Sequence, residues 1–234
     1  MNIYRKGFTL IELLVVISII AVLMAIMMPA LAKVRQQGQA VVCASNLKQL
    51  GLGFTLYSQT YDDFIAPVNT LSGKTITRSN FPSWCSQLGV ISGPLSWRTT
   101  VLPVILNSSV MNVNQAYEEF EEYAQQNFKC PSIKKSEPQW ISYTQNSDVD
   151  GWKNMSVKRP AETVMVLDVD RFEGVVYSQM WIDSDEHIDT VERIGKRHPD
   201  GEGYNVLFCD GRVDRVKNED DVIWRRDGSH NRRE

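Results

Sequence analysis

The residues of this sequence best suited to acid–base or metal chemistry lie in its last third. His198 is one of three histidines, and Asp168, Asp170 and Asp210 supply carboxylates in the same part of the chain. A histidine with carboxylates beside it can transfer protons in hydrolysis or hold a metal ion. However, the sequence contains no GxSxG, HExxH or P-loop pattern. We therefore expect no enzymatic activity, and we expect His198 to order a loop through hydrogen bonds to the backbone.

Oxygen donors in this region favour calcium as a candidate ion. Asp168 and Asp170 are separated by one residue, and Asp210 or Asp200 would add a further carboxylate if the fold brings it close. Such hard oxygen ligands suit Ca²⁺. The spacing does not match an EF-hand loop, so calcium is a hypothesis that depends on ligand type alone. We expect no other cofactor.

Four cysteines, Cys43, Cys85, Cys130 and Cys209, are widely spaced, and none belongs to a CxxC pair. The spacing therefore gives no support for a zinc site. In an oxidising compartment one or two disulfides could form, with three ways of pairing all four cysteines. A free buried thiol is an equally good interpretation of Cys43, which falls on a helix face.

An apolar segment near the N-terminus is long enough to cross a membrane. The twenty residues 13–32 are apolar except for Ser18 and Pro29. In a helix they would extend about 30 Å, which matches the hydrocarbon core of a bilayer. Basic residues flank both ends of the segment, so charge alone leaves its orientation open.

Two features of this region do not suit a plain membrane anchor. Glu12 lies inside the apolar region, where a carboxylate usually needs a partner, and no cation follows Lys6 locally. In addition, Gly7 and Phe8 place a small residue before an aromatic one at the edge of the apolar run, directly after basic residues.

Helical periodicity continues beyond Pro29. Apolar and small residues recur at spacings of three and four, which predicts an amphipathic helix packed on a globular domain and ended near Asp62, Asp63 and Pro67. The predicted inward face consists of Val41, Cys43, Ala44, Leu47, Gly51, Phe54, Ser58 and Tyr61.

The rest of the sequence predicts strands towards its end. A β-branched, apolar run at 163–169 is typical of a buried strand. The stretches 204–210 and 212–217 flank the dipeptide Asp210-Gly211, which favours a type I′ turn. We therefore expect a hairpin there.

Two charged segments are interpreted as solvated surface. Residues 113–126 predict a surface helix with an acidic cluster, and the C-terminal residues 224–234 form a basic tail. The formal net charge is −3, which gives no electrostatic footprint for nucleic acid. We expect no nucleic-acid partner.

The segment from Lys6 to Ile17, KGFTLIELLVVI, resembles the processing site of type IV prepilins and type II secretion pseudopilins. The resemblance implies that a prepilin peptidase cleaves between Gly7 and Phe8 and that Phe8 becomes N-methylated. Glu12 would then be the fifth residue of the mature chain, where the family has its assembly glutamate. Pro29 would occupy the position of the helix-kinking proline.

This resemblance implies a role for the acid in the apolar helix. The α-amino group of Phe8 in one subunit could pair with the Glu12 carboxylate of a neighbour. In a low dielectric such attraction is much stronger than in water, and either charge alone is costly. Burial of Glu12 would thus make assembly selective for one axial offset.

Further segments resemble one branch of the family, a set of large prepilin-like proteins. They are residues 43–51, 128–131, 141–146 and 198–211. The last resembles a C-terminal processing-associated signature in which a histidine precedes a DG turn, here His198 and Asp210-Gly211. The eleven residues between them are more than is usual, which lengthens the loop and leaves the role of His198 open.

We expect an α+β, pilin-like fold in which a long N-terminal helix, transmembrane in its first half, packs on an antiparallel β-sheet head. The expected parts are a leader (1–7), a transmembrane or filament-core helix (8–32), its amphipathic continuation (33–64) and a periplasmic head (65–234). The expected function is that of a structural subunit of a type II secretion pseudopilus or type IV pilus-like filament.

The alternatives are a membrane-anchored periplasmic binding module that does not polymerise, and a periplasmic enzyme on the same anchor. The resemblance implies a single-pass protein of the inner membrane with its head in the periplasm. The partners it implies are the prepilin peptidase and N-methyltransferase, and other pilin or pseudopilin subunits.

Overall fold

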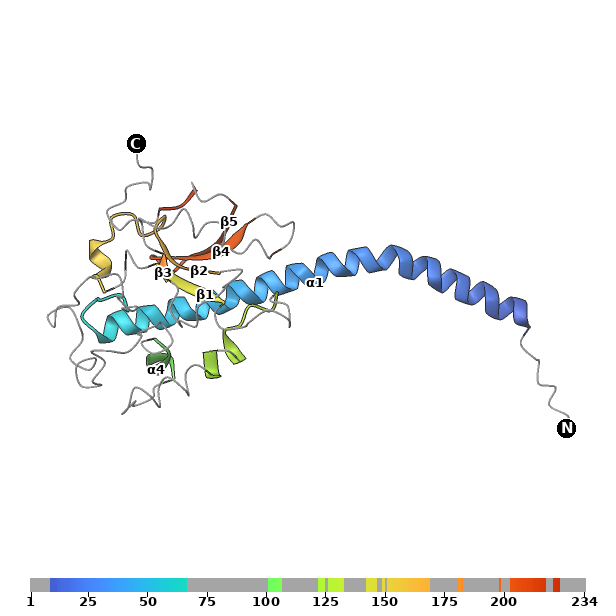
Figure 1. Ribbon diagram of the computed structural model, residues 1–234, viewed down its shortest axis with the longest axis horizontal. Helices are drawn as coiled ribbons and strands as arrows, with labels where there is room; N and C mark the ends of the chain where they lie inside the picture. The colour runs from blue at the N-terminus through green and yellow to red at the C-terminus, as the bar shows by residue number, and fades with distance from the viewer. Residues whose placement is uncertain are drawn as a thin grey trace.

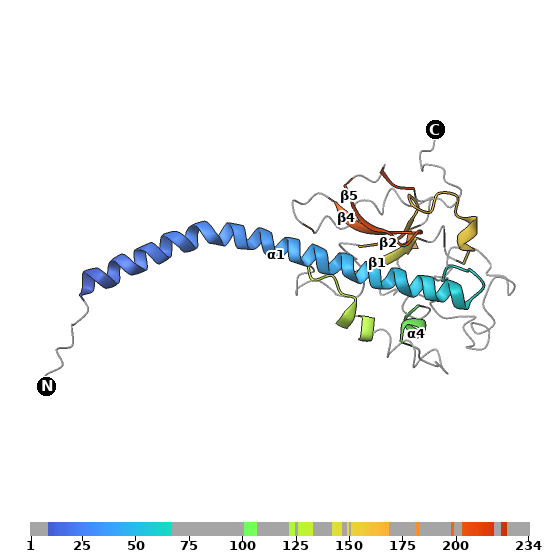
Figure 2. The ribbon, with the colours of Figure 1, turned by 180° about the vertical axis from the view of Figure 1, so that it is seen from behind.

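A 51-residue helix, α1 (Leu10–Thr60), dominates the structure. The computed structural model describes residues 9–66, 101–106, 122–124, 126–132, 142–146, 149, 151–168, 181–182, 198, 203–217 and 221–223. The C-terminal half of α1 lies against the head, and its N-terminal half extends away from it (Figure 1). The view from behind shows the same division of the helix (Figure 2).

The helix begins with a reciprocal cap. The hydroxyl of Thr9 accepts a hydrogen bond from the N–H of Glu12, and the Glu12 side chain accepts one from the N–H of Thr9. This capping box satisfies two backbone donors that helix geometry leaves without a partner. The helix therefore has a defined start at its N-terminal end.

Pro29 lies in the interior of α1, where it lacks an N–H group to donate to the preceding turn. The helix nevertheless continues through it without a break, and the ribbon of the extended half is curved (Figure 1). Pro29 therefore accompanies a bend of the helix and not an interruption, because one missing hydrogen bond does not break a helix that has many turns on either side.

The head contains a five-stranded sheet in the order β3-β1-β2-β4-β5. The strands are β1 (Tyr143–Asn146), β2 (Val164–Asp168), β3 (Trp181–Ile182), β4 (Tyr204–Phe208) and β5 (Val213–Val216). β1, β2, β4 and β5 pair antiparallel, and the short β3 joins β1 in parallel at the edge. The α+β, pilin-like arrangement is thus confirmed, and the strand predicted at 163–169 is β2.

The hairpin of β4 and β5 is confirmed, but its turn is not type I′. That turn requires positive φ at both central residues, and Asp210 is not among the described residues with positive φ. Instead, the three residues 209–211 form the loop. The N–H of Phe208 donates to the Arg212 carbonyl over 2.8 Å, and the N–H of Gly211 donates to the Phe208 carbonyl over 2.9 Å. Gly211, with φ +83°, supplies the left-handed residue of this loop.

The packed half of α1 lies between the sheet and a short helix, α4 (Leu102–Ile105) (Figures 1 and 2). A Cβ atom at Gly51 would lie 2.8 Å from the Leu207 side chain of β4. At Gly53 it would lie 2.5 Å from Ile105 and 2.6 Å from Val101. Both distances are too short for a real Cβ, so the two glycines allow close approach on two sides of the helix.

This packing on two sides widens the buried face beyond the predicted one. The buried residues of α1 are Cys43, Asn46, Leu47, Leu50, Gly51, Gly53, Phe54, Tyr57 and Ser58. Five of them belong to the predicted face. Val41 is 69% exposed and does not belong to that face: the head already contacts Gln39 and Ala40, but the side chain of Val41 lies on the uncovered side of the helix.

Candidate functional site

The N-terminal half of α1 exposes its apolar side chains. From Leu10 to Val34 the large apolar residues are 44–86% exposed. Within the part of the chain that the structure describes, α1 is the one helix long and apolar enough to cross a membrane, and its apolar stretch is not buried. So much apolar surface is stable only in lipid or against other apolar helices. The helix is therefore consistent with a membrane anchor.

Glu12 is the one acidic residue in this exposed half. Its Oε2 atom accepts hydrogen bonds from the N–H and the hydroxyl of Thr9, each over 2.8 Å. Glu12 therefore has a local hydrogen-bond partner that the sequence did not reveal, because Thr9 is the N-cap and places two neutral donors beside the carboxylate. Gly7 and Phe8 lie outside the described residues, so cleavage and methylation stay predictions.

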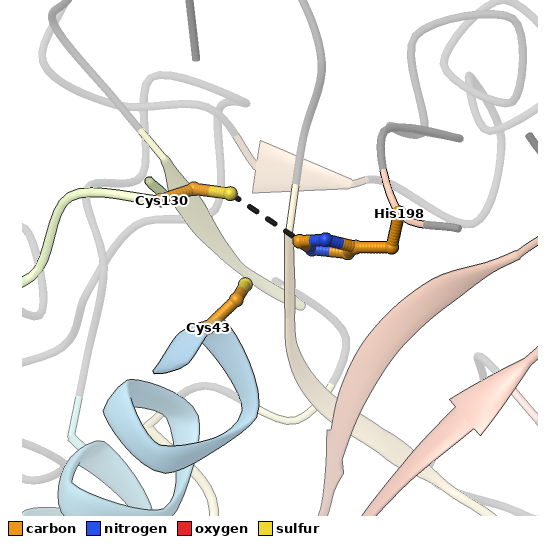
Figure 3. A group of neighbouring side chains, drawn as sticks. All are labelled: Cys43, Cys130 and His198. Carbon is orange, nitrogen blue, oxygen red and sulfur yellow. Dashed lines mark hydrogen bonds between the residues drawn. The ribbon is translucent and has the colours of Figure 1, made fainter. Parts of the chain in front are cut away.

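In the core of the head, four polar side chains from distant segments lie together. Cys43 comes from α1, Cys130 from the segment 126–132, and Asp168 from the end of β2. Figure 3 shows His198 pointing towards the two cysteines. The Nε2 atom of His198 lies 2.8 Å from Asp168 Oδ2 and 3.8 Å from Cys130 Sγ, and Cys43 Sγ lies 3.4 Å from Asp168 Oδ2. None of the four residues is more than 2% exposed.

Neighbouring hydroxyl groups fix the orientation of these side chains. Ser132 Oγ lies 3.3 Å from Nδ1 of His198, the ring nitrogen that faces away from the cluster. The Tyr143 hydroxyl donates to Cys43 Sγ over 3.4 Å. These contacts hold the imidazole ring and one sulfur in place, as the outer partners of a metal or catalytic site do.

The pKa values of Asp168 and His198 are both raised in this cluster. Burial raises the pKa of Asp168. Burial alone would lower the pKa of His198, but its hydrogen bonds to Asp168 and Cys130 outweigh that effect and raise the pKa to about 9. Both shifts keep a proton within the His198–Asp168 pair.

The two thiols differ from each other in acidity. The neighbouring Cys130 and burial raise the pKa of Cys43. The neighbouring Cys43 and the nearby imidazole of His198 lower the pKa of Cys130 to about 4. The surroundings therefore favour the thiolate form more at Cys130 than at Cys43.

A cysteine, a histidine and an aspartate also occur together in nucleophilic catalysis. In such triads the nucleophile and the carboxylate contact different nitrogens of the imidazole. Here Asp168 and Cys130 both approach Nε2 of His198, and all three residues are buried. The arrangement is therefore unsuited to attack on an external substrate. It can hold a proton, a metal ion or a bond between the two sulfurs.

The structure separates two of the residues predicted as calcium ligands. Asp168 is buried at one end of β2, where it pairs with Tyr143. Asp210 is exposed beyond the other end of β2, where its N–H donates to the Pro160 carbonyl. These two carboxylates therefore do not form one site. Asp170 lies outside the described residues.

The proximity of Cys43, Cys130 and His198 was not predicted. Cys130 and His198 are 68 residues apart in sequence, and local CxxC spacing carries no information about ligands that come from distant segments. His198 was expected to bond to the backbone, whereas its described contacts are side chains. One signal was present: all three residues lie in segments that resemble landmarks of one family branch.

A long helix with an exposed apolar half and a head built on an antiparallel sheet defines a pilin-like class of protein. Residues 3–28 match a family model described as the prokaryotic N-terminal methylation motif, which points to processing by a prepilin peptidase. Residues 32–161, more than half of the chain, match the family described as protein of unknown function DUF1559. The chain belongs to this family, and the two matches together are typical of type II secretion pseudopilin-like proteins. No curated protein and no solved structure matches.

Proposed function

We propose that this chain is a structural subunit of a filament, either a type II secretion pseudopilus or a related type IV pilus-like filament, and has no catalytic role. The observation that carries the proposal is the exposed apolar half of α1, from Leu10 to Val34. A soluble domain would cover such a surface. A subunit that moves from the membrane into a filament core needs it uncovered.

Transfer of α1 from membrane lipid into a filament core would change the free energy of most of this apolar surface only slightly. Lipid tails are about as apolar as leucine side chains, so helix association in lipid depends on packing and on polar contacts. Along the exposed half of α1, Glu12 is the charged side chain best placed to distinguish the two environments. Assembly would therefore depend on what Glu12 pairs with.

Pairing between subunits would use the new N-terminus. After cleavage, the α-amino group of Phe8 would bring a positive charge to the start of the helix. The two hydrogen bonds from Thr9 both end on Oε2 of Glu12, and the carboxylate has a second oxygen that a neighbouring amine can approach. In an apolar filament core, a correctly placed amine would be strongly favoured over an unpaired one.

The proposed location follows from the same processing step. Cleavage by a prepilin peptidase on the cytoplasmic side of the inner membrane would leave the helix spanning that membrane. The head would then lie in the periplasm. Other pilin or pseudopilin subunits are the proposed partners.

The first test is the intact mass and N-terminal residue of the protein purified from its native membrane. A chain that begins with methylated Phe8 supports the proposal. A chain that still begins with Met1 contradicts it, and the membrane-anchored binding module that does not polymerise would become the better explanation.

The second test separates two roles of Glu12. Glutamine can replace glutamate in a capping box, so Glu12→Gln preserves the helix start and removes only the charge. We expect both Glu12→Gln and Glu12→Ala to abolish filament recovery after shearing while the protein stays in the membrane fraction.

The matched control is Ser18→Ala, a change at another polar residue of the apolar segment, whose hydroxyl bonds to the Val15 carbonyl of its own helix. It should assemble like the original chain. Normal filament yield from Glu12→Gln would mean that Glu12 serves only as a cap, and the ion-pair mechanism would be abandoned.

A further inference from the structure

The buried cluster in the head has the ligand set and the spacing of a metal centre. The sulfur atoms of Cys43 and Cys130 and a ring nitrogen of His198 all lie within 4.8 Å of one another, and all three residues are buried (Figure 3). We propose that these three side chains bind one Zn²⁺ ion, with the carboxylate of Asp168 as the fourth ligand. This site is independent of filament assembly.

The distances suit tetrahedral coordination. Zinc lies about 2.3 Å from a thiolate sulfur and about 2.0–2.1 Å from an imidazole nitrogen, so a tetrahedral site holds its ligand atoms about 3.3–3.8 Å apart. The distance from Cys130 Sγ to His198 Nε2 is 3.8 Å. An ion between these atoms would therefore need only a small movement of the side chains.

Asp168 completes the set. Its Oδ2 atom lies 3.4 Å from Cys43 Sγ and 2.8 Å from His198 Nε2, so binding would widen only the second distance. Its Oδ1 atom is buried, and no described residue donates a hydrogen bond to it. A buried carboxylate oxygen without a donor is costly. A cation beside this carboxylate would remove that cost.

The chemistry of the donors selects zinc. Binding would release the thiol proton of Cys43 and the proton of the His198–Asp168 pair to solvent. The resulting two thiolates and neutral imidazole are soft or borderline ligands, which favour zinc over calcium or magnesium. Four protein ligands in a closed, buried site are typical of structural zinc. Ser132 contacts the second nitrogen of His198, which is the kind of outer contact that orients a metal-bound histidine.

The proposed ion would hold the head on the helix. Cys43 belongs to α1, whereas Cys130, Asp168 and His198 come from three separate segments of the head. Coordination would join these segments at one point near the place where α1 leaves the head. The free energy of zinc binding would then contribute directly to the stability of the folded head.

A disulfide between Cys43 and Cys130 is the competing state. It would form by loss of one hydrogen atom from each thiol to an oxidant, and it would remove both sulfurs as zinc ligands. The two states therefore exclude each other in one molecule, and a single preparation distinguishes them.

The test uses the full chain, purified from its native membrane in detergent without chelators. We expect one zinc per chain by elemental mass spectrometry, and an intact mass that corresponds to reduced Cys43 and Cys130. Replacement of the zinc by Co²⁺ should give the strong visible bands of tetrahedral cobalt and a thiolate-to-cobalt charge-transfer band. Absence of bound zinc, or a mass lower by two hydrogen atoms with these cysteines linked, would overturn the proposal.

Variants locate the ion. Cys43→Ser, Cys130→Ser and His198→Gln should each lose the zinc and the charge-transfer signal or weaken them strongly. Cys209→Ser, which changes a cysteine outside the cluster, is the matched control and should keep one zinc per chain. Zinc retained by a Cys43→Ser/Cys130→Ser double variant would place the ion elsewhere and refute the site.

Asp168→Asn tests the fourth ligand separately. It should bind zinc more weakly and shift the visible bands of the cobalt form, because an amide oxygen is a poorer ligand than a carboxylate. Unchanged affinity and an unchanged cobalt spectrum would exclude Asp168 from coordination. If a cysteine variant fails to fold, the zinc content and the cobalt spectrum of the original chain still decide the proposal.

Discussion

Single polar side chains in the core of the head join segments that are distant in sequence. The amide of Asn46, which is 7% exposed, donates to the Lys129 carbonyl and to the Tyr143 hydroxyl, each over 3.3 Å. The amide of Gln145 donates to the Ala66 carbonyl over 2.7 Å. Buried acceptors of this kind are costly when they lose a donor, so these amides stabilise the connections around α1.

Replacement of Asn46 by leucine tests this role. Asn46→Leu keeps the number and branching of the side-chain heavy atoms but removes the donor to the Lys129 carbonyl and the Tyr143 hydroxyl. We expect the free energy of unfolding of the head to fall by about 1–3 kcal/mol, measured by chemical denaturation in detergent. Gln49→Leu, at an exposed position of the same helix, should change it by about 0.5 kcal/mol or less. Equal effects of the two changes would contradict the argument.

The thiol of Cys209 should make the stability of the head depend on pH. Burial raises the pKa of Cys209, and the nearby carboxylate of Asp210 adds to this effect. The folded chain therefore keeps the thiol protonated at pH values where the unfolded chain, with a cysteine pKa of about 8.5, releases the proton. The stabilisation is complete below about pH 8.5 and is lost as the pH rises above that value.

The expected loss from this thiol is at most about 1.4 kcal/mol per pH unit above pH 8.5. The measurement compares denaturation curves of the original chain and of Cys209→Ala at several pH values under reducing conditions. The difference between the two pH profiles is the contribution of the Cys209 thiol. The variant should lose less stability between neutral and alkaline pH, because every other titrating group is common to both proteins. Parallel pH profiles would show that Cys209 does not titrate between the folded and unfolded states.

At the scale of secondary-structure elements, close packing on two sides of α1 depends on small residues. A Cβ at Gly53 would lie 2.5–2.7 Å from side-chain atoms of Ile105 and Val101. A Cβ at Gly38 would have no atom within 4 Å. The same change, glycine to alanine, should therefore have opposite effects at two positions of one helix.

Gly53→Ala should lower the free energy of unfolding by about 1–3 kcal/mol, since the added methyl group overpacks the contact with α4. Gly38→Ala should leave it unchanged or raise it by up to about 1 kcal/mol through better helix propensity. Thermal unfolding of both variants in detergent measures the difference. Stabilisation by Gly53→Ala would mean that α4 is not packed as described.

Local patterns were sufficient to predict most of these elements. The spacing of apolar residues predicted α1, a β-branched run predicted β2, and the Asp210-Gly211 dipeptide between two strand-like stretches predicted the hairpin of β4 and β5. The hairpin loop was predicted wrongly because the dipeptide Asp210-Gly211 fits two kinds of turn. The choice between them depends on where the strands pair, which is a tertiary property. For the same reason the sequence did not reveal the wider buried face at Leu50 and Gly53.

At the scale of the whole molecule, the functional residues differ in how far the sequence predicts them. Glu12 stands out locally, because a carboxylate in an apolar helix needs an explanation. The cluster of Cys43, Cys130, Asp168 and His198 has no local pattern, since its members meet only after the sheet has formed on α1. A search for local motifs therefore finds the N-terminal methylation motif with Glu12, but it does not show that the four residues in the centre of the head lie together.

Because α1 is divided into an exposed half and a packed half, we predict that the exposed half can be removed without loss of the head's fold. The first described contact with the head comes from Gln39, whose amide donates to the Pro131 carbonyl over 3.0 Å, and the first buried residue of α1 is Cys43. A chain of residues 35–234 therefore keeps every described contact between helix and head and loses the exposed apolar surface.

We expect the 35–234 chain to be soluble without detergent. Its free energy of unfolding should lie within about 0.5 kcal/mol of that of the full chain in micelles.

By contrast, a chain of residues 52–234 lacks Cys43, Leu47 and Leu50, which are fully buried. Loss of a buried leucine side chain costs about 2–5 kcal/mol, and a domain has only about 5–15 kcal/mol in total. The shorter chain should therefore not fold, which circular dichroism and denaturation would detect. An unfolded or aggregated 35–234 chain would mean that the extended half of α1 is part of the fold of the head, and that its apolar surface is not held free for lipid or for neighbouring subunits.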